Sequence, residues 1–203
     1  MTENTSHALY IHWPFCKKKC PYCDFNSHVR ESVDTNAWQK AMLQELRWYH
    51  AQAVARPLSS IFFGGGTPSL MPPSLAAALI EESEKLFGFT PDIEITLEAN
   101  PTSTENAKLQ DLRRAGVNRL SIGIQSLRPE ALKFLGREHS VGEALQALEM
   151  AAKIFDRYSF DLIYALPDQS LQSWEQELQK ALGYAGDHLS LYQLTIEQGT
   201  QFY

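Results

Sequence analysis

The sequence has very few thiols. Of its 203 residues only three are cysteines, and all three lie between positions 16 and 23. The count is odd, and residues 1–8 are polar with no apolar core typical of a secretory signal. A framework of structural disulfides is therefore excluded, and the pattern predicts a cytoplasmic protein that keeps its thiols reduced.

Long apolar runs and excess positive charge are also absent. No run approaches the length of a transmembrane helix, so no membrane-spanning segment is expected. The formal net charge is −6, which argues against a nucleic-acid partner. The length suits one sizeable hydrophobic core.

What is present is a cysteine motif with the spacing C-x3-C-x2-C, at Cys16, Cys20 and Cys23. Pro14 and Pro21 interrupt it, so it is predicted to be a loop. Three neighbouring thiolates without a fourth suit an iron–sulfur cluster that leaves one iron open to another ligand. The alternative is a zinc site, completed by His12 or His28.

Strand and helix patterns alternate along the whole chain. Strands are expected at 9–13, 59–63, 92–100, 119–126, 159–166 and 188–197, and helices at 34–55, 72–87, 104–115, 129–135, 141–155 and 171–184. This order is typical of an α/β fold with a parallel sheet. Six units are too few for a closed eight-stranded barrel, so we expect an open sheet or half-barrel.

Polar side chains interrupt three successive strands that should otherwise be apolar. Glu98, Gln125 and Asp161 each fall on the less apolar face of a strand. Unpaired buried carboxylates are costly, so the three predict a wet or ligand-filled concavity. The cysteine loop and the glycine turn at 64–66 follow the carboxyl ends of the first two strands, which is the edge where α/β folds bind ligands.

The stretch YIHWPFCKKKCPYCDF, residues 10–25, resembles the cluster-binding loop of the radical S-adenosylmethionine (SAM) superfamily. The resemblance implies an open (β/α)6 partial TIM barrel and one core domain over residues 1–203, without the family's C-terminal domain. It implies that the three cysteines hold a [4Fe–4S] cluster and that SAM completes it. It also implies a set of residues lining the SAM site or the neighbouring second-SAM or substrate region: Tyr10, Tyr22, Gly65, Gly66, Thr67, Glu98, Gln125, Arg137 and Asp161.

The lead-in to the first cysteine is similar to the branch that contains oxygen-independent coproporphyrinogen III oxidase and its haem-chaperone relatives. The oxidase carries a fourth cysteine two residues after the third, where this chain has Phe25. The resemblance therefore favours a haem chaperone that binds haem and delivers it to respiratory proteins, with a peripheral membrane contact through those acceptors. The alternative is the oxidase, which uses a SAM-derived radical to make protoporphyrinogen IX. Either interpretation implies SAM cleavage and a reducing electron donor. Three lysines in the cysteine loop are either a docking site for this donor or only a solvated loop tip: Lys17, Lys18 and Lys19.

Overall fold

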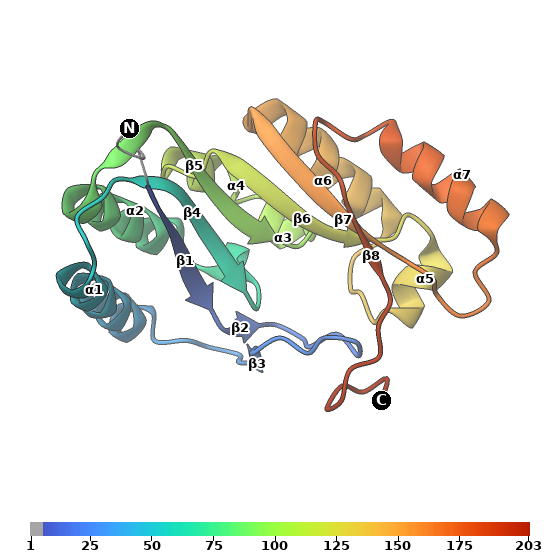
Figure 1. Ribbon diagram of the computed structural model, residues 1–203. Helices are drawn as coiled ribbons and strands as arrows, with labels where there is room; N and C mark the ends of the chain where they lie inside the picture. Colours follow the sequence, from blue (N-terminus) through green and yellow to red (C-terminus); the bar gives the residue numbers. More distant parts are fainter. Residues whose placement is uncertain (1–5) are drawn as a thin grey trace.

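A six-stranded parallel sheet organises the computed structural model, which describes residues 6–203 (Figure 1). The strands follow one another across the sheet in chain order, β1, β4, β5, β6, β7 and β8. Their bounds are His7–Trp13, Leu58–Gly65, Phe89–Ala99, Arg119–Gln125, Arg157–Tyr164 and Ser190–Gln193. The first and last strands do not pair with each other, so the sheet is the open half-barrel expected from the sequence.

The helices connect successive strands and lie along the outer face of the sheet (Figure 1). Their bounds are α1 Thr35–Gln52, α2 Pro73–Phe87, α3 Ser103–Asn106, α4 Leu109–Arg114, α5 Pro129–Phe134, α6 Val141–Ile154 and α7 Leu171–Leu182. Helix α1 packs on α2, α2 on α4, and α4 on α6. Within residues 6–203, none of these helices combines the length and apolar character needed to cross a bilayer.

The strands form where apolar side chains alternate. In β6, Leu120, Ile122 and Ile124 are buried against the helices, while Ser121 and Gly123 face the concave side. The core below the helices includes fully buried Trp13, Phe63 and Phe160. The concave face is therefore the polar one, as the sequence predicts.

The structure differs from the expected elements in three places. The helix expected at 104–115 is split into α3 and α4. The carboxylate of buried Glu105, near the end of α3, accepts a hydrogen bond from the amide of Asn100, which precedes α3. The strand expected at 188–197 is only four residues long, which fits an edge strand with one neighbour. A small parallel pair joins β2 (Phe15–Cys16) to β3 (His28–Val29) and was not expected.

Candidate functional site

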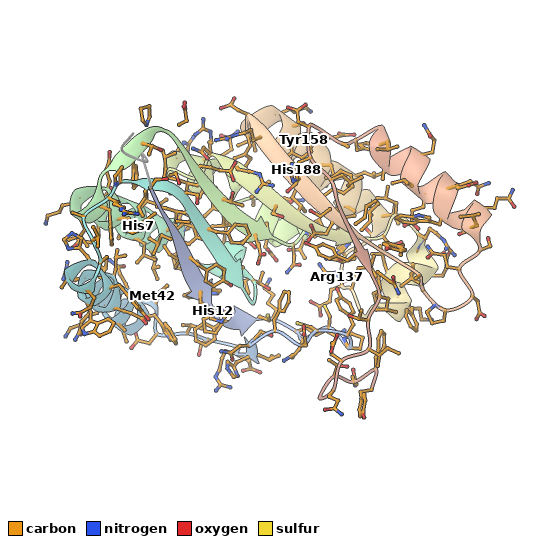
Figure 2. All side chains as sticks on the ribbon, in the orientation of Figure 1. His7, His12, Met42, Arg137, Tyr158 and His188 are labelled. Atoms are coloured by element: carbon orange, nitrogen blue, oxygen red, sulfur yellow. The ribbon has the colours of Figure 1, made fainter. Side chains whose placement is uncertain are left out.

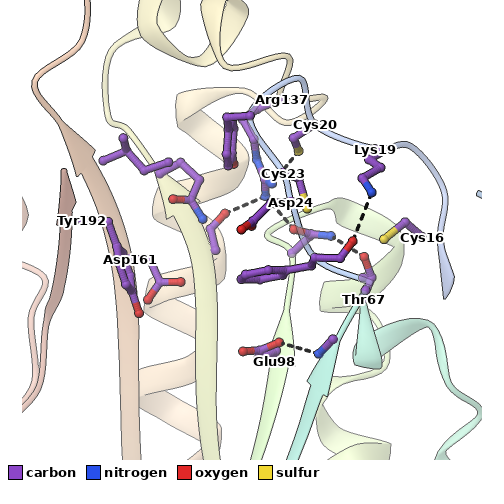
Figure 3. A pocket seen from close by; sticks show the side chains of 18 of the residues that line it. Cys16, Lys19, Cys20, Cys23, Asp24, Thr67, Glu98, Arg137, Asp161 and Tyr192 are labelled. Carbon is purple, nitrogen blue, oxygen red and sulfur yellow. Dashed lines mark hydrogen bonds between the residues drawn. The ribbon is translucent and has the colours of Figure 1, made fainter. Parts of the chain in front are cut away.

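The cysteine loop lies across the carboxyl ends of the strands and closes one side of a cavity of about 310 Å³ (Figures 1 and 3). Cys16, Cys20 and Cys23 are free thiols that all line this cavity. Cys16 begins the loop within β2 and is buried, because the glycine turn packs against it. Burial raises the pKa of its thiol, while hydrogen bonds with Thr67 and Ser27 act in the opposite direction.

The zinc alternative finds no support in the geometry. Among residues 6–203, no three histidine, cysteine or acidic side chains are grouped tightly enough to hold a single metal ion. Nε2 of His12 lies 2.9 Å from the carbonyl oxygen of Asn26, and His28 is exposed on β3. Thiols that line one cavity without converging on a point suit a cluster better, because each thiolate binds a different iron. The three thiols therefore fit a [4Fe–4S] cluster.

The glycine turn is packed closely against the cysteine loop. A Cβ on Gly65, whose φ is +118°, would lie 2.6 Å from the His12 ring, and one on Gly66 would lie 2.7 Å from the carbonyl oxygen of Phe15. The amide of Gly66 donates to the Trp13 carbonyl over 2.7 Å, and the amide of Thr67 donates to the Phe15 carbonyl over 2.9 Å. The glycines thus allow the close approach of the loop, and these amides are already paired within the protein.

Two carboxyl groups face the cavity from β5 and β7, as Figure 3 shows for Glu98 and Asp161. Burial raises the pKa of Glu98 to about 7; a hydrogen bond from the Gly65 amide opposes this rise, and the charge of Asp161 adds to it. Burial likewise raises the pKa of Asp161 to about 6. A hydrogen bond with Ser190 and the positive charges of Arg137 and Arg119 oppose this rise. Such a pair attracts a cationic ligand, because a positive charge would favour the ionised form of both groups.

Gln125 ends β6 in a strained backbone conformation. Its φ is +69°, in the left-handed region that residues with a Cβ rarely adopt, and the β6–β7 register shifts just before it. Its side-chain nitrogen lies 3.1 Å from the position of a Cβ on Gly123, so a larger residue there would push the Gln125 amide aside by a few tenths of an ångström. Strain of this kind is typical of functional sites, and it brings Gln125 into the lining of the cavity.

Arg137 lies in the connection between α5 and α6, and its side chain extends to Cys20 in the cysteine loop (Figure 3). Its Nη1 donates to the sulfur of Cys20 over 3.3 Å, and its Nη2 donates to Asn100 Oδ1 over 2.5 Å and to the Gly123 carbonyl over 2.7 Å. Tyr22 is half-buried beside Arg137 and Cys20, and desolvation of its hydroxyl raises the pKa of that group. A sequence pattern gives little support to Arg137, because its contacts lie up to 117 residues away.

The structure brings most of the predicted site residues to one place. The members of the predicted set that line the cavity are Cys16, Cys20, Cys23, Tyr22, Gly65, Gly66, Thr67, Glu98, Gln125, Arg137 and Asp161. Tyr10 is the exception: it does not line this cavity and is 56% exposed on the concave side of β1. Its ring stacks on Phe62, and its hydroxyl lies 3.3 Å from His12 Nδ1.

Several lining residues are absent from the predicted set. Asn100 directly follows β5, Ser121 and Gly123 lie on the concave face of β6, and Tyr192 lies on β8. The rule that ligands bind at the carboxyl ends of strands would have selected Asn100. In Figure 2, Arg137 lies toward this end of the strands, whereas His7, Tyr158 and His188 lie toward the other.

The fold and the site together define a class of protein: an open β/α half-barrel with a three-cysteine loop at the carboxyl edge of its sheet. The family model described as "Radical SAM superfamily" matches residues 10–181, and the chain belongs to this superfamily. Membership implies a [4Fe–4S] cluster and SAM, which agrees with the donor set described above.

Two curated relatives and one solved structure place the chain more narrowly. "Radical S-adenosyl methionine domain-containing protein 1, mitochondrial" from Danio rerio is 44% identical over 203 residues, covering 98% of this chain and 46% of the relative. "Heme chaperone HemW" from Escherichia coli K12 is 44% identical over 197 residues, covering 96% and 52%. Coproporphyrinogen III oxidase (HemN) from E. coli, described as a radical SAM enzyme, superposes with a TM-score of 0.83 at 30% identity, covering 95% and 45%.

The chain thus spans about half the length of these relatives. The similarity extends over nearly all of this chain, including the cysteine loop and every strand of the sheet.

Proposed function

We propose that the protein is a radical SAM protein that acts as a haem chaperone, binding haem and delivering it to haem-requiring respiratory proteins. The observation that carries this proposal is the 44% identity to a protein named heme chaperone, over 96% of the chain. Phe25, 59% exposed at the cavity, stands where the oxidase carries its fourth cysteine and supports the same choice.

Within this proposal, residues 1–203 form the radical SAM core domain. Cys16, Cys20 and Cys23 hold the cluster, and SAM lies in the cavity between the cysteine loop and the strands. The glycine turn, Tyr22, Glu98, Gln125, Arg137 and Asp161 surround it, with Tyr10 further out on β1. When bound, the cluster and SAM supply one-electron chemistry, while the protein's own groups orient SAM and shield it from water.

The ionised Glu98 and Asp161 attract the cationic centres of SAM, its amino group and its sulfonium. The Nε of Arg137 is buried and has no hydrogen-bond partner among the described residues.

The alternative function is oxygen-independent coproporphyrinogen III oxidation to protoporphyrinogen IX. The specific observation in its favour is the fold similarity to the E. coli oxidase, with a TM-score of 0.83. Identity to that protein is 30%, below the 44% to the chaperone, and Phe25 adds to the difference. We therefore keep the oxidase as the second candidate.

The size of the cavity bears on where haem would bind. About 310 Å³ lies at the lower end of the range for small-molecule sites. It suits a nucleoside-sized ligand such as SAM, so within this proposal we assign the cavity to SAM rather than to haem. Partners in this proposal are haem, haem-acceptor proteins with their membrane, and an electron donor. The cytoplasmic location stays a prediction, because the animal relatives carry the word mitochondrial in their names.

The test uses the full-length protein, reconstituted anaerobically with iron and sulfide. A chaperone binds haem in near-stoichiometric amount, seen as a Soret shift on titration, and transfers it to an apo-cytochrome acceptor, seen as gain of the acceptor's spectrum. Incubation with coproporphyrinogen III, SAM and dithionite is the second arm. Clean formation of protoporphyrinogen IX without haem transfer would select the oxidase in place of the chaperone.

A further inference from the structure

Arg137 connects the cysteine loop to the interior of the half-barrel through three hydrogen bonds. Nη1 donates to Cys20 Sγ over 3.3 Å, and Nη2 donates to Asn100 Oδ1 and to the Gly123 carbonyl. These acceptors come from the loop after β2, from the residue after β5 and from β6. The guanidinium is thereby fixed in one orientation, with a charged N–H group directed at a thiol.

Asn100 is the residue that holds this arrangement. Its Oδ1 accepts from Arg137, its Nδ2 donates to Thr67 Oγ1 over 3.2 Å, and its backbone amide donates to the Glu105 carboxylate over 3.0 Å. The Thr67 hydroxyl in turn lies near the Cys16 thiol and acts to lower its pKa. A continuous chain of side chains therefore runs from Cys16 through Thr67, Asn100 and Arg137 to Cys20.

The family resemblance implies a place for Arg137 around a second SAM or the substrate. The geometry adds a different role, because both of its Nη atoms are already directed at protein acceptors, one of them a sulfur. Hydrogen bonds to the sulfurs of a cluster are among the factors that set its reduction potential. A donor that carries positive charge stabilises the reduced cluster more than the oxidised one, because reduction adds one negative charge.

We propose that Arg137, positioned by Asn100, raises the reduction potential of the cluster through its N–H···S hydrogen bond to Cys20. Arg137 is a positioning residue in this role, and Asn100 acts only through it. The inference rests on the proposed cluster ligation by the three cysteines. It does not depend on whether the protein carries haem or oxidises a porphyrinogen.

The test measures the cluster potential of the reconstituted protein without SAM, by redox titration monitored by electron paramagnetic resonance. Mediators reduced by dithionite pass one electron to each cluster, from its 2+ to its 1+ state. Arg137→Met keeps an unbranched, flexible stem but removes the donor and the charge. We expect the ratio of reduced to oxidised cluster at a fixed solution potential to fall about tenfold, the effect of losing one charge-assisted hydrogen bond.

Two further variants and one control make the result specific. Arg137→Lys keeps the charge and a single donor, and Asn100→Ala removes the acceptor that orients Arg137, so both should lower the ratio by less than Arg137→Met does. Arg119→Met is the matched control, because Arg119 also lies on the concave face but donates to Thr96 and Ser159 rather than to a sulfur. It should leave the potential unchanged.

Iron and sulfide content are measured for each variant, so that loss of the cluster is separated from a change in its potential. If Arg137→Met takes up little cluster, the reduction potentials of Arg137→Lys and Asn100→Ala test the tuning role in its place. Loaded variants with the wild-type potential, or an equal shift in Arg119→Met, would overturn the tuning role while leaving the ligand set intact. A wild-type protein that takes up neither iron nor sulfide would overturn the ligand set itself, and the tuning role with it.

Discussion

The carboxylate of Glu98 accepts a hydrogen bond from the backbone amide of Gly65 over 3.2 Å, drawn as a dashed line in Figure 3. This bond joins the carboxyl end of β5 to the glycine turn after β4, and the turn in turn packs against the cysteine loop. Glu98 is thus both a cavity-lining acid and part of the scaffold that supports the loop. Because the pKa of Glu98 is raised, its effect on stability can be measured by varying pH, separately from its effect on ligand binding.

The pKa of Glu98 makes stability depend on pH. Because burial raises it from 4.5 to about 7, the folded protein binds more protons than the unfolded chain between these values, and the free energy of unfolding falls as pH rises through this window. Glu98→Gln keeps an acceptor for Gly65 but removes the titration. Urea unfolding of the apo-protein at pH 5 and pH 8 should show a loss of stability at pH 8 that is larger in the wild type than in the variant by up to about 3 kcal/mol, less where water reaches the carboxylate. His139, whose pKa burial lowers to about 4, titrates with the opposite sign and contributes equally to both proteins.

Other groups around Glu98 shape this comparison. Asp161 faces it from β7 with a pKa of about 6 and titrates with the same sign, so part of the slope will remain in Glu98→Gln. Burial raises the pKa of Tyr10, and the charge of Asp161 raises the pKa of Tyr192. The charge of Glu98 adds a smaller rise to each, so both tyrosines titrate above the tested range. Glu84→Gln, on an exposed position of α2 outside the cavity lining, is the control for the substitution itself. Identical slopes in the wild type and Glu98→Gln would contradict the prediction.

SAM affinity gives a second prediction at the same residue. Glu98→Ala removes the carboxylate that would pair with a cationic part of SAM, and leaves the three thiols in place. Loss of one charged hydrogen bond weakens binding by about tenfold to a hundredfold. Calorimetric titration of the reconstituted protein with SAM measures the affinity, and iron analysis checks that the cluster is unaffected. An unchanged affinity would remove Glu98 from the SAM site.

Much of the architecture can be read from the sequence, because parallel strands and their helices leave a local pattern. The alternation of Leu120, Ile122 and Ile124 with smaller or polar residues places β6 and its buried face correctly. The length of the edge strand was not predicted correctly: β8 has one neighbour and ends at Gln193, although apolar residues continue to Ile196. Local pattern does not reveal where pairing stops.

The site follows a similar division. Glu98, Gln125 and Asp161 were predicted from their strand faces and do line one cavity. The amides of Gly65, Gly66 and Thr67 donate to the Glu98 carboxylate and to the carbonyls of Trp13 and Phe15, and the glycine pattern alone does not reveal these acceptors because they lie on other strands. The pairing of Asn100 with Arg137 depends on contacts between distant segments, which no spacing in the sequence encodes.

The cysteine ligands give a third prediction. Cys16→Ser, Cys20→Ser or Cys23→Ser should each abolish cluster loading, because a hydroxyl is a much poorer ligand for iron than a thiolate. Iron and sulfide per protein, with the visible absorbance of the reconstituted sample, measure the loading. Lys17→Ser is the matched control, since Lys17 is exposed in the same loop and carries no sulfur. Full iron content in any one of the three variants would exclude that cysteine from the ligand set.

The close packing of Gly66 gives the last prediction. A methyl group there would lie 2.7 Å from the carbonyl oxygen and 2.9 Å from the carbonyl carbon of Phe15, and 3.0 Å from Cys16 Sγ. The first two are backbone atoms of β2, so the strand must move, and Cys16 with it. We expect Gly66→Ala to lower the free energy of unfolding by about 1–3 kcal/mol, as overpacking does, and to reduce cluster loading.

Gly142→Ala is the control for this change, because a Cβ at that helical position meets only Ser140 Oγ at 3.8 Å, an ordinary contact. Alanine there should be neutral or slightly stabilising, since it favours helix over glycine. Urea unfolding measures both variants, and iron analysis after reconstitution follows the loop. If Gly66→Ala retains wild-type stability and iron content, the glycine turn does not support Cys16. The link from Glu98 through the turn to the cluster loop would then be absent.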